Sequence, residues 1–205
     1  PAVKGFYKLN GMFNVGGGYE SPINGGFEMM CDASKWLLGG IPIDYYYSVD
    51  FAAIVELVDA IGGVDYEMDM SYTGEAGTQY QTGMQHLDGQ GVLDYLRARR
   101  NATQGASDRE RVNRQKRMMI AIFNKIKSSN LFSTLPAVLN SVKGGFFTNT
   151  SIEQTLAIAN FARNISADSI GTYSLFGEYK AGPISWNWTF VDPQNRIEII
   201  QKVWG

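Results

Sequence analysis

Arginine is concentrated in one stretch of the chain. Seven of the nine arginines fall between Arg97 and Arg117, although the protein as a whole is slightly acidic, with a formal net charge of −2. Clustered guanidinium groups bind multiply charged oxyanions, above all phosphate and pyrophosphate, which arginine can hold through two parallel hydrogen bonds. The stretch therefore predicts a binding site for a phosphate or pyrophosphate group.

The second half of this stretch has the spacing of one helix face. A helix over 108–127 places four polar residues on one side, and the next turns of that side are apolar. The polar residues are Asp108, Arg111, Arg114 and Gln115, and the apolar ones are Met118 and Ile122. A solvated helix stabilised by pairs such as Asp108 with Arg111 has the same spacing, but the number of arginines favours a site.

The roles of three residues in the stretch stay open at this point. Asp108 could complement the helix dipole, or it could orient an arginine and help to manage a proton or a metal. Arg97 and Arg99 share a face only where the chain is extended, because on a helix they diverge by about 200°.

Other candidate sites are weaker. His86 is the single histidine and Cys31 the single cysteine, so these two cannot assemble a zinc cluster. The chain has no Gly-x-Ser-x-Gly elbow, and Gly16 to Gly18 lack the Lys-Ser/Thr of a P-loop. Many large, adaptable apolar side chains would suit a pocket for a long hydrocarbon: Phe13, Met29, Met30, Trp36, Tyr45, Tyr46, Tyr47, Met118, Met119 and Phe123.

The elements that must position the arginines alternate along the chain. A length of 205 residues with 44% apolar content suits one well-buried domain, and no apolar run reaches the 18 residues of a membrane span. The pattern predicts strands over 43–49, 64–68, 169–176 and 188–191, and helices over 26–38, 51–61, 89–97, 108–127, 131–142, 151–164 and 193–203. We therefore expect a layered α/β fold in a single domain over 1–205.

The order of motifs resembles that of a known family. Tyr95 to Gln115 reads Tyr-x-Arg-x-Arg, then Asp-x-x-Arg-x-x-Arg-Gln, which is similar to the signature of the LytR-CpsA-Psr family. Four more blocks follow the family's order, so the resemblance covers residues 8–125. They are Lys8-Leu9-Asn10 with Gly16-Gly17, Asp44-Tyr45-Tyr46 with Val49-Asp50-Phe51, Leu57 to Val64, and Leu87-Asp88-Gly89.

The resemblance implies a fold and an activity. It implies a three-layer α-β-α domain with a mixed central sheet flanked by helices. Family members are membrane-anchored phosphotransferases on the outer face of mostly Gram-positive cells. They move glycopolymers such as teichoic acid or capsule from a polyprenyl-pyrophosphate carrier to peptidoglycan, with Mg²⁺ as cofactor and the lipid tail in an apolar pocket. By resemblance, the pyrophosphate ligands are Arg97, Arg99, Arg111, Arg114 and Gln115, and the catalytic residues are Asp108, Arg97 and Arg99.

Part of the family pattern does not occur in this chain. The family's early Asp-x-Arg region with metal-binding carboxylates, its Ser-x-Pro-Arg-Asp-Thr segment and its membrane anchor have no counterpart here. The chain is therefore expected to be either the C-terminal fragment of a longer polypeptide or a shortened form. For a fragment, we expect the Mg²⁺ ligands, the first strands of the sheet and the anchor to lie upstream of Pro1.

Two alternatives from other classes remain. One is a non-catalytic binding module for lipid pyrophosphates or cell-wall polymer, which the missing blocks motivate. The other is a DNA-binding regulator that uses helix 108–127 as a basic helix. The apolar residues after Met118 and the lack of basic charge elsewhere argue against a nucleic-acid partner.

Overall fold

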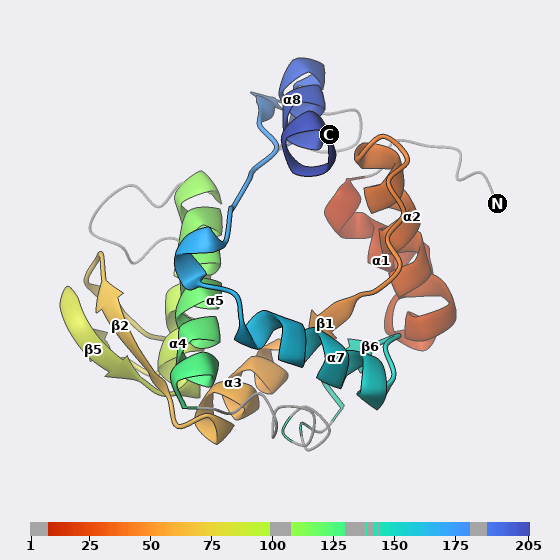
Figure 1. Cartoon of the computed structure of the whole chain (residues 1–205). Coiled ribbons are helices and arrows are strands. Elements are labelled where there is room, and N and C mark those ends of the chain that lie inside the picture. The colour runs from red at the N-terminus through yellow and green to blue at the C-terminus, as the bar shows by residue number, and fades with distance from the viewer. Residues whose placement is uncertain (1–7, 99–107, 130–137, 139–141, 143, 181–187) are drawn as a thin grey trace. The chain divides into compact units, whose positions relative to one another are not determined.

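The computed structural model describes residues 8–98, 108–129, 138, 142, 144–180 and 188–205. The chain divides into two compact units, and each is described by itself (Figure 1). The first consists of Pro1–Tyr46 with Thr172–Gly205, and the second of Tyr47–Gly171.

The first unit is mainly helical. Short helical turns and α1 (Met12–Val15) precede α2 (Phe27–Leu37), which ends before Gly39 and Gly40, both with positive φ. Strands β7 (Gly177–Lys180) and β8 (Trp188–Val191) form an antiparallel pair. Helix α8 (Pro193–Trp204) follows, and the carboxylate of Asp192 caps its first turn by accepting backbone N–H bonds from Gln194 and Asn195.

One predicted strand, which crosses the division between the two units at Gly171, is wrong. Instead of a strand over 169–176, the chain makes a helical turn at Ala167–Ser169, and β7 begins only at Gly177. The amide of Phe176 donates to the side chain of Asn195 at 2.7 Å, and among the described residues no strand pairs with 170–176. An apolar segment without a pairing partner has no ladder to hold it extended.

The second unit begins with a capped helix and a hairpin. The carboxylate of Asp50 accepts the Ala53 amide at 2.8 Å and starts α3 (Phe51–Ala60), as predicted. Strand β2 (Val64–Met68) then pairs with β5 (Gly83–Leu87), and alternate residues of β2 are buried. A smaller hairpin of β3 (Tyr72–Thr73) and β4 (Gln79–Tyr80) lies between them in the chain.

The described part of this unit also contains three α-helices and one more strand pair. Helix α4 (Gly89–Arg97) packs on α3 and α5 (Asp108–Ser128), and α5 also packs on β2 (Figure 1). Helix α7 (Ile152–Arg163) starts with the predicted capping box, in which Ser151 and Gln154 bond each other's backbone amides. Strand β1 (Tyr47–Val49) pairs with β6 (Phe146–Thr148).

The core of the second unit lies between β2, β5 and the helices. Its buried members are Val58, Ile61, Val64, Tyr66, Met68, Tyr72, Leu87, Val92, Tyr95, Met118, Ile126 and Ala159. Tyr95 and Met118 are completely buried, and both belong to the elements that carry the arginines. The arginine-bearing helices are therefore anchored in the core.

The predicted α/β character is confirmed, but the sheet differs from the expected one. The described strands form four two-stranded antiparallel sheets and no mixed central sheet. Three of these pairs join strands that lie near each other in the chain, and antiparallel strands of this kind can pair without a central sheet. The helix predicted over 131–142 falls almost entirely outside the described residues. No helix in the described part of the chain has the length and apolar character needed to cross a membrane.

Candidate functional site

Helix α4 brings the first arginine to a defined place. The carboxylate of Asp88 accepts the Gly91 amide at 2.7 Å and caps the helix. A Cβ at Gly89 would overlap the backbone of Val55, so glycine allows α4 to approach α3 closely. The helix ends at Arg97, and Ala98 leaves the helical conformation with φ −55° and ψ 112°.

Arg97 has two neighbours from other elements. Its guanidinium group forms an ion pair with Glu75 at 2.8 Å, and it lies over the ring of Phe51 at 4.9 Å from the centroid. Glu75 belongs to the turn between β3 and β4, and its side chain is 64% exposed. The Phe51 ring packs against one face of the guanidinium group. The exposed carboxylate of Glu75 is a partner that an arriving anion could replace.

Arg114 of α5 is buried and reaches the end of α4. The residue is 3% exposed, and its Nη2 donates to the Ala98 carbonyl at 2.6 Å. The guanidinium carbon lies 5.7 Å from the centroid of the Tyr95 ring. Its Nε is buried and has no hydrogen-bond partner among the described residues. Within the described part of the chain, no carboxylate forms an ion pair with this arginine.

Arg117 lies one turn further along α5 and has a carboxylate partner. Its Nη2 pairs with Asp69, which follows β2, and its Nε donates to the Tyr66 hydroxyl at 3.4 Å. Burial works against the charge, but the bond to Tyr66 and the charge of Asp69 raise the pKa of Arg117 above the ordinary arginine value. Arg117 is therefore held in place, and the negative charge of Asp69 already compensates its positive charge.

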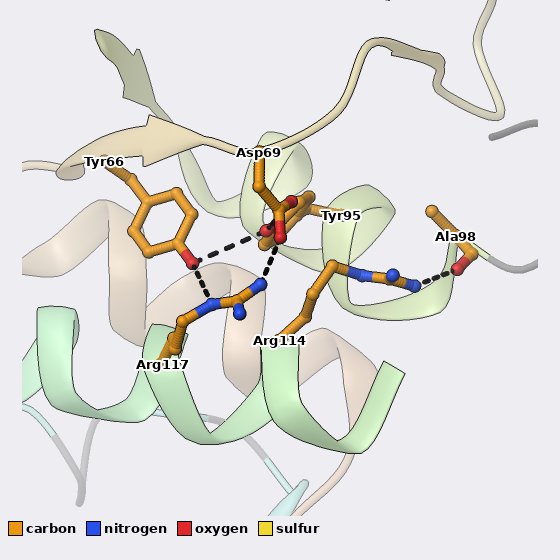
Figure 2. Close-up of polar contacts among 6 residues, drawn as sticks. All are labelled: Tyr66, Asp69, Tyr95, Ala98, Arg114 and Arg117. Carbon is orange, nitrogen blue, oxygen red and sulfur yellow. Dashed lines mark hydrogen bonds and ion pairs between the residues drawn. The ribbon is translucent and has the colours of Figure 1, made fainter. Parts of the chain in front are cut away.

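Tyr95 connects the two arginines. Its hydroxyl donates to the second oxygen of Asp69 at 2.7 Å and lies 3.4 Å from the Tyr66 hydroxyl. Burial, followed by the hydrogen bonds to Tyr66 and Asp69, raises the pKa of Tyr95, so the phenol stays protonated. Figure 2 shows the resulting chain of contacts, from Arg117 and Asp69 through Tyr95 toward Arg114 and the Ala98 carbonyl.

The remaining predicted site residues are placed only in part. Arg111 and Gln115 are half-buried on α5. Asp108 is the first residue of α5, but its side chain lies outside the described residues, as does all of Arg99. Of the predicted set, the structure brings Arg97 and Arg114 to the same end of α4. Their role as ligands and that of Asp108 stay predictions.

Sequence reasoning did not single out four residues that contact the arginines: Phe51, Tyr66, Asp69 and Glu75. Tyr66 had a weak signal, because it occupies an inward position of an alternating strand next to the arginine helix. The other three lie just outside or at the ends of their elements, where residue type and spacing do not indicate a partner.

The described residues do not fit a magnesium site. They contain no group of three histidine, cysteine, aspartate or glutamate side chains that could hold a metal ion. Asp69 is engaged with Arg117 and Tyr95, and one oxygen of the buried Asp94 accepts the Gln90 amide at 2.7 Å. A Mg²⁺ ion requires several oxygen ligands in an octahedron, so we derive no step through a metal from these residues.

Comparison with known proteins identifies the family. The sequence model of the LytR_cpsA_psr family matches residues 4–202. The chain belongs to the LytR-CpsA-Psr family. The family that the order of motifs indicated is therefore confirmed.

Relatives within the LytR-CpsA-Psr family carry transferase names. The chain is 30% identical over 161 residues to TagU of Bacillus mycoides (strain KBAB4), a polyisoprenyl-teichoic acid–peptidoglycan teichoic acid transferase; these residues are 76% of this chain and 51% of the relative. TagV of Bacillus subtilis (strain 168), which has the same transferase name, is 25% identical over 143 residues, or 67% of this chain and 36% of the relative. The chain thus spans about half the length, or less, of these curated relatives.

The fold agrees with that of a solved member of the family. The crystal structure of B. subtilis TagV matches this chain with a TM-score of 0.78 and 22% identity, covering 98% of this chain and 75% of that one. The agreement in fold supports the placement of α4 and α5 in a LytR-CpsA-Psr domain.

Proposed function

We propose that this LytR-CpsA-Psr chain is part of a phosphotransferase that attaches glycopolymers, such as teichoic acid or capsule, to peptidoglycan. The donor would be a glycopolymer on a polyprenyl-pyrophosphate carrier. Membership of the family and the transferase names of TagU and TagV support this activity. The place of action would be the extracytoplasmic face of the membrane or the cell wall of a Gram-positive bacterium.

The observation that carries the proposal is the environment of Arg114. Arg114 is only 3% exposed as a residue, and a buried cation is costly unless an anion compensates its charge. The described contacts of Arg114 are a carbonyl oxygen and an aromatic face, neither of which carries a full negative charge. A pyrophosphate bound at the end of α4 would supply the missing charge and would accept a bond from Nε.

The arrangement suits phosphoryl transfer because this reaction depends on positioning and on charge stabilisation. In the proposed reaction an acceptor hydroxyl of peptidoglycan attacks the phosphorus that bears the glycopolymer. The bond to the bridging oxygen breaks, and polyprenyl phosphate leaves. Arg97 and Arg114 would hold the two phosphoryl groups and stabilise the negative charge on the leaving phosphate. Arg99, Arg111 and Gln115 are proposed as further ligands, and Asp108 is proposed to orient an arginine or accept the hydroxyl proton.

The complete domain would contain more than the described elements. We include in the proposal a single domain over 1–205, with a three-layer arrangement in which β1 and β6 form part of a mixed central sheet. Carboxylates that hold Mg²⁺ and a membrane anchor would come from a segment upstream of Pro1, as the family resemblance implies. A Mg²⁺ ion bound there would neutralise further charge on the pyrophosphate.

Calorimetric titration with geranyl pyrophosphate tests the binding site. Arg114→Ala should weaken binding by roughly 10- to 150-fold, the value of one charged hydrogen-bonding group. Arg114→Lys should recover only part of the loss, because lysine lacks the planar fork. Arg163→Ala, which removes an exposed arginine of α7, is the matched control and should bind normally. Equal affinities for all four proteins would reject this site.

A non-catalytic binding module for lipid pyrophosphates or cell-wall polymer is the second candidate. It is motivated by the family's Asp-x-Arg and Ser-x-Pro-Arg-Asp-Thr blocks, which have no counterpart in this sequence. Both candidates bind the pyrophosphate, so the distinguishing measurement is transfer of a lipid-linked oligosaccharide to peptidoglycan in the presence of Mg²⁺. Measured transfer by the chain would reject the binding module.

A DNA-binding regulator has less support from the structure. Arg114 is buried, and Arg117 is paired with Asp69, so α5 does not present these two charges to a DNA backbone. A salt-dependent gel shift at nanomolar protein would revive this alternative.

A further inference from the structure

We propose that Asp69 is a positioning residue for Arg114 and that it acts through the side chain of Tyr95. The inference rests on the proposed function, because it concerns how the arginine of that site is held. Asp69 does not itself touch Arg114, and the described contacts give it no direct place among the anion ligands.

Tyr95 contacts both Asp69 and Arg114. One end of its side chain, the hydroxyl, donates to Asp69 at 2.7 Å. The face of its ring lies beneath the guanidinium group of Arg114, with 5.7 Å between the guanidinium carbon and the ring centroid. The bond to Asp69 therefore fixes the tilt of the surface on which the Arg114 guanidinium group lies.

Each oxygen of the Asp69 carboxylate has a different donor as its partner. Oδ1 accepts the Tyr95 hydroxyl, and Oδ2 pairs with Arg117. The Arg117 side chain also bonds Tyr66, whose ring lies against that of Tyr95 with centroids 5.3 Å apart. Arg117 thus orients the carboxylate, while the ring of Tyr66 packs against that of Tyr95 and restrains it.

Arg114 is held by two of its neighbours before any anion binds. The Ala98 carbonyl holds Arg114 from one side through Nη2, and the Tyr95 ring supports it from another (Figure 2). Anion affinity depends on guanidinium groups that are already in position, because mobile ones lose conformational freedom on binding. Loss of the Asp69–Tyr95 bond should therefore weaken anion binding without removing any ligand.

A double-mutant cycle tests this mechanism. Tyr95→Phe keeps the ring but loses the hydroxyl, and we combine it with Arg114→Ala in titrations with geranyl pyrophosphate. Tyr95→Phe should weaken binding by roughly 3- to 10-fold, less than the loss of a charged ligand, because the lost hydrogen bond acts on the anion only through Arg114. In the Arg114→Ala background the same change should have no further effect, because the residue acts through Arg114.

Two further variants separate positioning from a general loss of stability. Asp69→Asn still offers an acceptor to Tyr95 and should bind more tightly than Asp69→Leu, which offers none. Tyr80→Phe removes another part-buried phenol, which stacks on Tyr72 and has no described contact with Arg114, and it should bind normally. Melting temperatures measured in parallel show whether each variant is folded at the temperature of the titration.

The outcomes are distinguishable. If Arg114→Ala weakens binding but Tyr95→Phe lowers only the melting temperature, the positioning role is overturned and the proposed function stands. If Tyr95→Phe has the same effect in both backgrounds, it does not act through Arg114, and the inference again fails alone. If Arg114→Ala itself binds normally, the proposed site and the positioning role are both wrong.

Discussion

Arg114 and Arg117 lie one turn apart on α5, yet their surroundings are opposite. Arg117 is half-exposed and has a carboxylate, Asp69, as its partner. Arg114 is buried, and its described partners are the Ala98 carbonyl and the Tyr95 ring. The burial alone would suggest that Arg114 is the structural residue and Arg117 the functional one, but the proposed site assigns the reverse roles because of the distribution of counter-charge.

In the proposed site, this difference in counter-charge separates the structural arginine, Arg117, from the binding one, Arg114. A cation whose charge is already balanced gains little from a further anion, whereas one without a carboxylate gains the full interaction. Arg97 is intermediate, because its partner Glu75 is exposed and can move away. The comparison can be tested at four places, which differ in the size of the expected effect.

The largest effect is expected at Met118, which continues the face of Arg114 by one turn. Met118 is completely buried in the core, whereas Met119 is 70% exposed. Met118→Ala should lower the free energy of unfolding by about 2–5 kcal/mol, and Met119→Ala should leave it nearly unchanged. Denaturant titrations of both variants measure this. A stable Met118→Ala protein would place Met118 in a lipid pocket, as the sequence pattern suggested, and not in the core.

The next effect separates the two arginines directly. Arg117→Met should lower the free energy of unfolding by about 0.5–1 kcal/mol, because it breaks a half-exposed ion pair. Arg114→Met should stay within about 1 kcal/mol of the wild type, because relief of an uncompensated buried charge offsets the lost bond to Ala98. Affinity for geranyl pyrophosphate should fall far more in Arg114→Met than in Arg117→Met. The opposite ranking of affinities would reverse the assignment of roles.

A smaller effect is expected at Glu75. Because its carboxylate competes with an incoming anion for Arg97, Glu75→Gln should raise affinity for geranyl pyrophosphate by roughly 1.5- to 5-fold, the range of an exposed ion pair. Glu67→Gln, on β2, removes an exposed carboxylate without a described arginine partner and is the control. If Glu75→Gln weakens binding, the carboxylate helps to hold Arg97 in place and does not compete with the ligand.

The smallest effect concerns an exposed pair on the β2–β5 hairpin. The hydrogen bond from His86, with Nδ1 2.7 Å from the Asp65 carboxylate, lowers the pKa of Asp65 below its ordinary value of 3.8. The stabilisation by this pair is complete above that ordinary value and is lost as the pH falls through the lower folded-state value. His86→Gln should move the carboxyl pKa of Asp65 back up, as measured by carbon NMR titration. An unchanged pKa would show that His86 does not hold this carboxylate.

Local signals in the sequence predicted much of the fold. The cap at Asp50 and the capping box at Ser151 each depend on residues within three positions, and both helices begin where these signals place them. The strand over 64–68 was predicted correctly, because one buried face imposes alternation on five successive residues. The strand over 169–176 was wrong, since strand formation requires a partner that the local pattern does not reveal.

The candidate site was less accessible from the sequence. The arginine stretch and its motif identified the region, because residue type and spacing are visible within twenty positions. Asp69 and Arg117, by contrast, are 48 positions apart, and Tyr95 and Asp69 are 26 apart. Nothing in the local pattern shows that these side chains meet, nor that Arg114 has no carboxylate partner among the described residues.

The pairing of β1 with β6 also has a consequence for the order of folding. Tyr47 bonds Thr150 across 103 positions of the chain, and the Asp50 amide donates to the Gly145 carbonyl beside that pair. Closing so large a loop is entropically costly, and contacts between distant segments slow folding. The β2–β5 hairpin with α4 and α5 involves much nearer segments. It can therefore form early during synthesis, while β6 is still inside the ribosome, and the arginine-bearing helices would be assembled before the second unit is closed.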